Sequence, residues 1–288
     1  MWTQISQHIS ETTGKPFTVE RQKSVSGGCI NQGYCLIGSD IKYFVKINHA
    51  SKVEMFAAEA LGLKEMAQTQ TIRVPKPICW GMTERSSYIV LEWLEFGSSH
   101  NSAWEEMGIK LAKMHNYQGE NKFGWSENNT IGSTPQVNNW TDTWSDFFAN
   151  HRIGFQLKLA NRKGGNFGNY NQIVDKVRQI LASIEPQPSL VHGDLWSGNV
   201  AVTDAGEPVI LDPATYYGDR EVDLAMTELF GGFPAAFYRG YNEVFPLDKG
   251  YKKRKTLYNL YHILNHFNLF GGGYGSQANF MIQEVLKN

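Results

Sequence analysis

The sequence predicts an α+β protein with a small lobe built on an antiparallel sheet and a larger lobe made mainly of helices. Before residue 95, short apolar runs rich in β-branched and aromatic residues indicate strands. After Gly97, apolar residues recur with helical spacing. The length of 288 residues fits one large domain or two that pack intimately. We therefore expect a bilobal chain, with an N-terminal lobe over residues 1–94 that ends in a hinge and a C-terminal lobe over residues 95–288.

Composition excludes several classes of protein. Hydrophobic residues make up 41% and aromatic residues 13%, which is incompatible with a disordered chain. The 27 basic and 28 acidic residues nearly cancel, so we expect neither nucleic acid nor an anionic membrane as a partner. No apolar run approaches the roughly 20 residues that span a bilayer, and the first twenty residues lack the apolar stretch of a signal peptide. Three cysteines are too few for a disulfide framework. A cytoplasmic protein with reduced thiols is expected.

The N-terminal lobe is expected to hold five strands and two helices. Residues 38–40 supply a hairpin turn, and Ser51 with Glu54 forms a capping box that begins a helix. The expected helices cover residues 3–12 and 51–63, and the expected strands cover residues 17–25, 34–37, 41–47, 78–81 and 88–93.

The C-terminal lobe is expected to be helical, with a few short strands. Ser102 and Glu105 form a second capping box before a helix whose apolar face carries Met107 and Met114. Residues 118–139 and 161–170 are expected to be irregular. Further helices are expected at residues 141–161, 170–184, 221–231, 234–244, 251–270 and 277–287, and strands at 190–192, 199–202 and 208–211.

The most informative residues are Asp194, Asn199 and Asp212. Phosphoryl transfer from ATP needs a carboxylate that orients the attacking hydroxyl and hard oxygen ligands for Mg²⁺. The Asp-x-x-x-x-Asn spacing of the first two residues is that of the protein-kinase catalytic loop, and an Asp that ends the next strand suits a second metal ligand. Asp and Asn also occur in ordinary turns, where they bond to backbone. Their place between short strands favours catalysis.

A kinase also needs companion residues in the N-terminal lobe. A glycine-containing turn lies between the first two expected strands, at residues 24–33, where backbone amides could approach phosphates. It departs from the Gly-x-Gly-x-x-Gly pattern, and alone it indicates only a hairpin. Lys46 lies on the third strand and Glu59 lies in the middle of the following helix. An exposed strand lysine is the ordinary alternative, but these elements in this order favour a kinase.

The chain resembles the fructosamine kinase (ketosamine-3-kinase) family, in the aminoglycoside-phosphotransferase and choline-kinase branch of the protein-kinase-like fold. The resemblance runs from about residue 10 to near the C-terminus. Its core, His-Gly-Asp, marks the wider superfamily, whereas the tryptophan at position 196 and the Asp-Leu-Ala-Met-Thr-Glu-Leu-Phe-Gly-Gly run point to the narrower family. The segments that carry it are His192-Gly-Asp-Leu-Trp-Ser-Gly-Asn199, Leu211-Asp-Pro-Ala214, residues 216–233, 27–30, 59–62 and 91–94, and Pro135-Gln-Val-Asn-Asn-Trp140.

The resemblance implies a role for each matching residue. Asp194 is similar to the catalytic base, Asn199 and Asp212 to the Mg²⁺ ligands, and Lys46 with Glu59 to the ion pair that positions the ATP phosphates. The remaining nucleotide contacts would come from two places. Gly27 and Gly28 would cover the phosphates, and the hinge backbone of Glu92, Trp93 and Leu94 would meet adenine.

The resemblance further implies an ATP-dependent kinase that phosphorylates the carbon-3 hydroxyl of ketosamines such as ribulosamine, erythrulosamine or fructosamine, in deglycation. Asp212 is followed by Pro-Ala rather than Phe-Gly, and no Ala-Pro-Glu segment follows, so activation-loop switching is not expected. The ketosamine could be a small molecule or protein-bound, and the protein a monomer or homodimer. Alternatives are another aminoglycoside- or choline-type kinase, a silent nucleotide-binding regulator and, last, a metal-dependent hydrolase.

Four other residues have two interpretations each. Trp196 either forms a wall for the amine-bearing end of the substrate or packs beneath the loop. Asp223 could contact the substrate, but it is expected to be a structural cap that ties the catalytic loop. His115 could be a ligand, but it is expected to be a satisfied core histidine. Cys29, in the phosphate-covering turn, is a candidate redox residue whose oxidation would inhibit ATP binding, although a merely tolerated small residue is the simpler interpretation.

Overall fold

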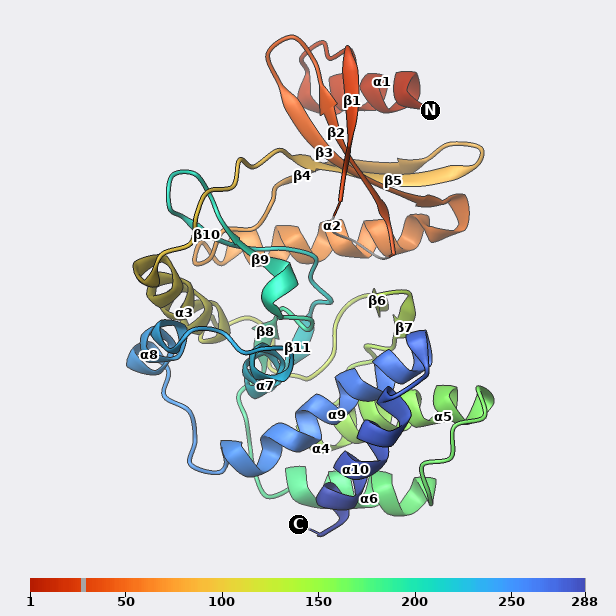
Figure 1. Cartoon of the computed structure of the whole chain (residues 1–288), viewed down its shortest axis with the longest axis vertical. Helices are drawn as coiled ribbons and strands as arrows, with labels where there is room; N and C mark the ends of the chain where they lie inside the picture. The colour runs from red at the N-terminus through yellow and green to blue at the C-terminus, as the bar shows by residue number, and fades with distance from the viewer. Residues whose placement is uncertain (27–29, 288) are drawn as a thin grey trace. The chain divides into compact units, whose positions relative to one another are not determined.

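The structure, a computed structural model, describes residues 1–26 and 30–287. The chain divides into two compact units (Figure 1). Unit 1 comprises Met1–Ala103 together with Gly198–Pro213, and unit 2 comprises Trp104–Ser197 together with Ala214–Asn288. The candidate catalytic residues are therefore shared between the units, because Asp194 belongs to unit 2 whereas Asn199 and Asp212 belong to unit 1.

Unit 1 is built on a five-stranded antiparallel sheet in the order β1-β2-β3-β5-β4. Its elements are α1 (Trp2–Thr13), β1 (Arg21–Val25), β2 (Gln32–Ile37), β3 (Lys42–His49), η1 (Ala50–Lys52), α2 (Val53–Gln68), β4 (Pro77–Met82) and β5 (Ser86–Glu92).

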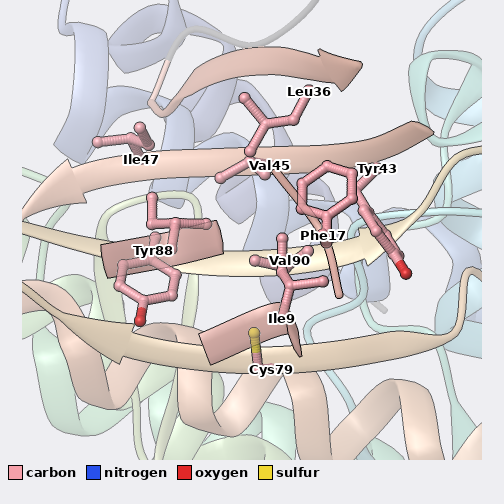
Figure 2. Close-up of a cluster of buried hydrophobic side chains, with 10 residues drawn as sticks. Ile9, Phe17, Leu36, Tyr43, Val45, Ile47, Cys79, Tyr88 and Val90 are labelled. Atoms are coloured by element: carbon pink, nitrogen blue, oxygen red, sulfur yellow. The ribbon is translucent and has the colours of Figure 1, made fainter. Parts of the chain in front are cut away.

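One face of this sheet forms a core with α1. Ile5 and Ile9 of α1 are fully buried against Val45 of β3 and Val90 of β5, which are register partners; Figure 2 shows part of this cluster. Successive side chains of a strand point to opposite faces. Lys46, which follows Val45, therefore faces away from α1 and toward the side of the sheet where α2 supplies its partner.

The second segment of unit 1 is a hairpin of β9 (Val200–Val202) and β10 (Pro208–Ile210), preceded by η3 (Ser197–Asn199). The turn falls at residues 203–206, and Gly206 has a φ of 86°. Backbone bridges join the hairpin to the rest of unit 1, from Thr203 to Phe96 and from Val209 to Arg73. These bridges hold a segment that is distant in sequence against the end of the sheet lobe.

Unit 2 is mainly helical. Its helices are α3 (Asn101–His115, whose first turn counts with unit 1), α4 (Trp144–Phe147), η2 (Phe148–Gly154), α5 (Phe155–Arg162), α6 (Tyr170–Leu181), α7 (Glu221–Leu229), α8 (Ala235–Val244), α9 (Tyr251–Phe270) and α10 (Tyr274–Lys287). Two short antiparallel pairs join β6 (Asn129–Ile131) to β7 (Thr134–Gln136), and β8 (Ser189–Val191) to β11 (Tyr216–Gly218).

The predicted α+β class is confirmed, and all expected helices are present. Both capping boxes were wrong: α3 begins at Asn101, so Ser102 lies inside it, and Ser51 lies in η1, where its backbone N–H is bound by His49. Three features were missed. They are the β6–β7 pair inside the stretch expected to be irregular, strand β11, and the seven-residue π-helical segment η2 between α4 and α5.

Within the described residues, no helix combines the length and apolar character required to cross a membrane.

Candidate active site

Lys46 is the centre of a buried charge cluster in unit 1. Its side chain is only 7% exposed, and its Nζ donates to Glu59 Oε1 at 2.7 Å. It also forms an ion pair with Asp212. A buried ammonium with two carboxylates is well compensated, because unpaired burial of a charge is costly. The exposed-lysine alternative is thereby excluded. The Asp212 carboxylate is 48% exposed and available to a further cation.

The β9–β10 hairpin brings Asn199 beside Asp212. The Leu211 N–H donates to the Asn199 carbonyl at 2.8 Å, so the residue before Asp212 is bonded directly to Asn199. Asp212 has a φ of 54°, a left-handed conformation that is uncommon outside glycine and that Asp tolerates better than most residues. Such backbone strain concentrates at functional sites. An amide and a carboxylate are the oxygen donors that Mg²⁺ prefers.

The predicted hinge residues begin at Glu92, the last residue of β5, and continue through Trp93 and Leu94. Glu92 does not present its side chain freely, because its carboxylate accepts from Arg73 Nη2 and from the Lys76 N–H, both at 2.6 Å. Its own N–H donates to the Lys76 carbonyl. Lys42 and, to a smaller extent, the buried Trp93 indole N–H hold the pKa of the Glu95 carboxyl below its usual range. Leu94 continues the segment without regular structure.

The loop that carries Asp194 depends on a glycine. Gly193 has a φ of 80°, and a Cβ at this position would clash with the Ala214 carbonyl oxygen. The Ala214 N–H in turn donates to the His192 carbonyl at 2.8 Å. Glycine is thus required at position 193 both for the left-handed backbone and for the close approach of the Ala214 segment.

A buried carboxylate, that of Asp223, binds the backbone of the same loop. Asp223 Oδ2 accepts from the His192 N–H at 2.7 Å, and Oδ1 accepts from the Gly193 N–H at 2.8 Å. Burial acts to raise the pKa of Asp223, but the hydrogen bond and charge of His115, the charge of His192 and the Gly193 N–H together hold the pKa below its usual range. The expected loop-tying role is confirmed, although the N-cap of α7 is Arg220 and not Asp223.

His115 is a satisfied core histidine, as expected. Its ring is fully buried, with Nε2 3.1 Å from Asp223 Oδ2 and Nδ1 2.8 Å from the Tyr241 hydroxyl. Both nitrogens are therefore engaged, Nε2 with Asp223 and Nδ1 with Tyr241. A second buried network of unit 2 joins the Tyr258 hydroxyl to Asp219, and of these two residues only Asp219 lies in the family-like run at residues 216–233.

Trp196 lies two residues after Asp194 and is 39% exposed, which favours the substrate-wall interpretation over packing beneath the loop. Its ring lies edge-on to that of Phe230, with the ring centroids 6.4 Å apart. The centroids of the Phe230 and His266 rings are 4.9 Å apart. Phe270 and Tyr274 continue the same group of rings beyond His266. Burial lowers the pKa of His266 and favours its neutral form.

The structure thus brings Lys46, Glu59 and Asp212 together. Asn199 is joined to the residue before Asp212 by the Leu211 hydrogen bond. Asp194 is placed in the other unit, on a loop fixed by Asp223. Gly27, Gly28 and Cys29 lie outside the described residues, so the phosphate-covering turn and the redox hypothesis stay predictions. Within the described part of the chain, there is no cluster of three or more His, Cys, Asp or Glu side chains that could hold a metal.

Comparisons with known proteins identify relatives over the whole chain. The family model described as fructosamine kinase matches residues 1–288. A protein of Synechocystis sp. named "Probable ketoamine kinase" is 62% identical over 286 residues, covering 99% of this chain and 97% of the relative. A protein of Arabidopsis thaliana named "Protein-ribulosamine 3-kinase, chloroplastic" is 43% identical over 281 residues, covering 96% of this chain and 86% of the relative.

Solved structures agree with these relatives. The crystal structure of a candidate fructosamine-3-kinase from Haemophilus somnus superposes with a TM-score of 0.94 at 36% identity, covering 99% of this chain and 98% of the other. A choline kinase from Streptococcus pneumoniae has a TM-score of 0.68 at 15% identity, with 99% and 98% of the two chains covered. The second similarity establishes the shared fold alone.

Proposed function

The chain belongs to the fructosamine kinase family, and from that premise we propose that it transfers the γ-phosphoryl group of ATP to the carbon-3 hydroxyl of a ketosamine, such as ribulosamine, erythrulosamine or fructosamine. The observation that carries the proposal is the buried ion-pair cluster of Lys46 with Glu59 and Asp212. A binding-only module has no need of a strained, partly exposed carboxylate beside that lysine. The name of the Arabidopsis relative supports a ribulosamine acceptor.

In the proposed mechanism, Lys46 binds the phosphates of ATP and Glu59 fixes the position of its ammonium group. Asn199 and Asp212 would hold Mg²⁺, to which they offer an amide and a carboxylate oxygen. When bound there, Mg²⁺ would supply positive charge to offset the charge on the transferred phosphoryl group. The pairing of Asp212 with Lys46 keeps that carboxylate in place when the nucleotide is absent.

Asp194 is the proposed catalytic base. Its carboxylate would accept a hydrogen bond from the acceptor hydroxyl, align that oxygen with the γ-phosphorus and take up the proton. The loose transition state of phosphoryl transfer demands little covalent chemistry from the protein, so alignment supplies most of the acceleration. Asp223 and Gly193 matter because they fix the backbone on which Asp194 is carried.

Trp196 and Phe230 are the proposed wall for the amine-bearing end of the acceptor. A ketosamine nitrogen is a secondary amine that is protonated near neutral pH, and aromatic faces attract cations. The exposed indole of Trp196, two residues from Asp194, is suited to that end of the substrate. Phosphorylation at carbon 3 would weaken the adduct, so that the sugar is shed and the amine restored.

The test is an acceptor screen with purified protein and MgATP. ADP release is measured with ribulosamine, erythrulosamine and fructosamine derivatives of lysine, both free and protein-bound, and with an aminoglycoside and choline. We expect turnover with ketosamines and phosphate on carbon 3. Turnover only with an aminoglycoside or choline would replace the proposed acceptor, and no turnover with any acceptor would support a silent regulator.

The proposed base is tested by Asp194→Ala. We expect kcat to fall by two to four orders of magnitude, as for loss of a positioned base, while the Kd of ATP stays within about threefold. Asp204→Ala is the control, because Asp204 is exposed in the β9–β10 turn. Turnover of Asp194→Ala close to that of the wild type would remove Asp194 from the mechanism.

A further inference from the structure

Arg152 is a buried cation for which the proposed chemistry assigns no role. Its side chain is fully buried, and it lies on η2, the π-helical segment. Segments with π-helical bonding are rare in proteins, and those that do occur are often found at functional sites. Within the described part of the chain its guanidinium bonds to carbonyl and amide oxygens and forms no ion pair. Burial of a cation without a carboxylate is costly, so its presence calls for an explanation.

Aromatic rings and two oxygen acceptors hold this guanidinium. Its carbon lies 4.0 Å from the ring centroid of Tyr216 and 4.5 Å from that of Phe147. Nη1 donates to the Val137 carbonyl and Nη2 to Asn138 Oδ1, both at 2.7 Å. Nε is buried without a partner in the described residues. The guanidinium thus donates hydrogen bonds through its Nη atoms and also stacks its plane on aromatic rings. Lysine could not make both kinds of contact.

From Asn138, a chain of side-chain amides leads to the backbone that follows Asp212. Asn138 Nδ2 donates to Asn129 Oδ1 at 2.9 Å, and Asn129 Nδ2 donates to the Thr215 carbonyl at 2.8 Å. Gln136 Nε2 bonds to the same Asn129 oxygen and to the Ala214 carbonyl at 3.0 Å. The β6–β7 pair therefore anchors two successive carbonyls of one segment.

That segment is bonded to the loop of the proposed base. Ala214 donates its N–H to the His192 carbonyl, and Tyr216, on which Arg152 stacks, is the register partner of Val191. Asp194 follows His192 by two residues. Arg152 thus supports the loop through Tyr216 and through the amide chain, while Asp223 binds the backbone N–H groups of the loop itself.

We propose that Arg152 is a positioning residue for phosphoryl transfer. It fixes the segment after Asp212, and through it the Asp194 loop, in the arrangement needed for turnover. This inference rests on the proposed role of Asp194. It explains how a chain without an Ala-Pro-Glu segment keeps this region ordered: a permanent buried guanidinium and amide network takes the place of an anchor that a covalent modification could switch.

The test compares Arg152→Met with Arg178→Met, in which an arginine on α6 that is more than one-third exposed is lost. Replacement of a buried charge by an apolar side chain of similar length often leaves stability unchanged. With MgATP and ribulosyl-lysine, we expect kcat per folded molecule to fall at least tenfold in Arg152→Met. The KM of ATP should stay within twofold, and Arg178→Met should resemble the wild type.

A second variant keeps the proposal testable if Arg152→Met does not fold. Gln136→Met removes the donor to the Ala214 carbonyl at similar volume, and kcat per folded molecule should fall at least fivefold with the KM of ATP unchanged. A kcat within twofold of the wild type in either folded variant would overturn the proposal, as would a loss explained entirely by the folded fraction. A wild type that fails to phosphorylate ribulosyl-lysine would instead contradict the proposed function.

Discussion

At the scale of single residues, the geometry around Gly193 carries the strongest local requirement. Its left-handed φ of 80° and the nearby Ala214 carbonyl both exclude a side chain. Gly206 offers a matched comparison, because its φ of 86° is similar but nothing lies within 4 Å of a Cβ built there. The two positions separate the cost of backbone conformation from that of the clash.

We predict that Gly193→Ala is far more damaging than Gly206→Ala. The left-handed conformation costs an alanine about 1–2 kcal/mol at either site, and the clash at Gly193 adds to that cost and displaces the Asp194 loop. Urea unfolding should show Gly206→Ala destabilised by about 1 kcal/mol with near-normal kcat. Gly193→Ala should lose at least tenfold in kcat and more stability. Equal effects of the two substitutions would contradict this account.

Lys46 and Glu59 show what residue types and order can predict. Strand alternation beside Val45 places Lys46 on the face of the sheet away from α1, and Glu59 lies in the middle of α2. The capping box predicted for Ser51 and Glu54 was wrong, because η1 occupies that turn. The pair was predictable because both residues belong to one sheet–helix unit with short connections.

At the scale of elements, the start of α7 is tied to α9 by a buried acid–phenol pair. The Tyr258 hydroxyl donates to Asp219 Oδ2 at 2.5 Å, and the Trp144 indole N–H donates to that hydroxyl at 3.1 Å. Burial raises the pKa of Asp219 from 3.8 to about 6, and the charge of Glu221 adds to the rise. The folded protein therefore keeps this acid protonated up to about pH 6, whereas the unfolded chain releases the proton near pH 3.8.

We predict that this carboxyl makes stability fall as the pH rises. The folded state holds a proton that the unfolded chain releases near pH 3.8, so the contribution is complete below about pH 4 and is lost as the pH rises through about 6. About two pKa units correspond to roughly 3 kcal/mol. Asp219→Asn, which mimics the neutral acid, should gain stability relative to the wild type between pH 4 and pH 7.

Urea unfolding at four values of pH across that range checks this expectation. Asp204→Asn, in the exposed β9–β10 turn, is the control and should run parallel to the wild type. If the Asp219→Asn curve also ran parallel to the wild type, the pKa of Asp219 would not be raised in the folded state.

The longer elements were predictable, and the short ones were not. The expected helix at residues 251–270 coincides with α9, because twenty residues of helical periodicity leave little ambiguity. Strands of three residues, such as β6 and β11, carry too few side chains to show an alternation. The π-helical η2 was missed because its apolar spacing differs little from that of the helices on either side.

At the scale of the whole molecule, nucleotide binding should be visible as stability. A ligand at 100 times its Kd stabilises the folded state by about 2.7 kcal/mol. We therefore predict that MgATP raises Tm by about 5 °C, given the usual shift per kcal/mol for domains of this size class. ATP with a chelator should produce a smaller shift, because the proposed ligands Asn199 and Asp212 would act only through the metal.

Asp212→Asn is the informative variant for this measurement. It should retain the shift caused by ATP alone and lose the additional shift caused by Mg²⁺. Differential scanning fluorimetry with and without the chelator gives both values. An undiminished magnesium-dependent shift in Asp212→Asn would remove Asp212 from the proposed metal site.

The lobe boundary at residues 94 and 95 stays a prediction, although the chain separates into compact units in a related way. The segment Gly198–Pro213 belongs to unit 1 despite its distance in sequence. Pairing of Thr203 with Phe96 and of Val209 with Arg73 accounts for this membership. Such contacts join residues more than 100 positions apart, so the local sequence pattern does not predict them.

The sequence by itself determined the α+β class, the family and the identity of the candidate chemical residues, because motif spacing and hydrophobic period are local properties of the chain. The tertiary structure alone decided how those residues are supported. The Asp223 hydrogen bonds to the His192–Gly193 backbone, the Tyr258 hydrogen bond to Asp219 and the Arg152 hydrogen bond to Asn138 join residues 14 to 39 positions apart in sequence. Burial and hydrogen bonding between such distant positions exist only once the chain is folded, so no local pattern announces them.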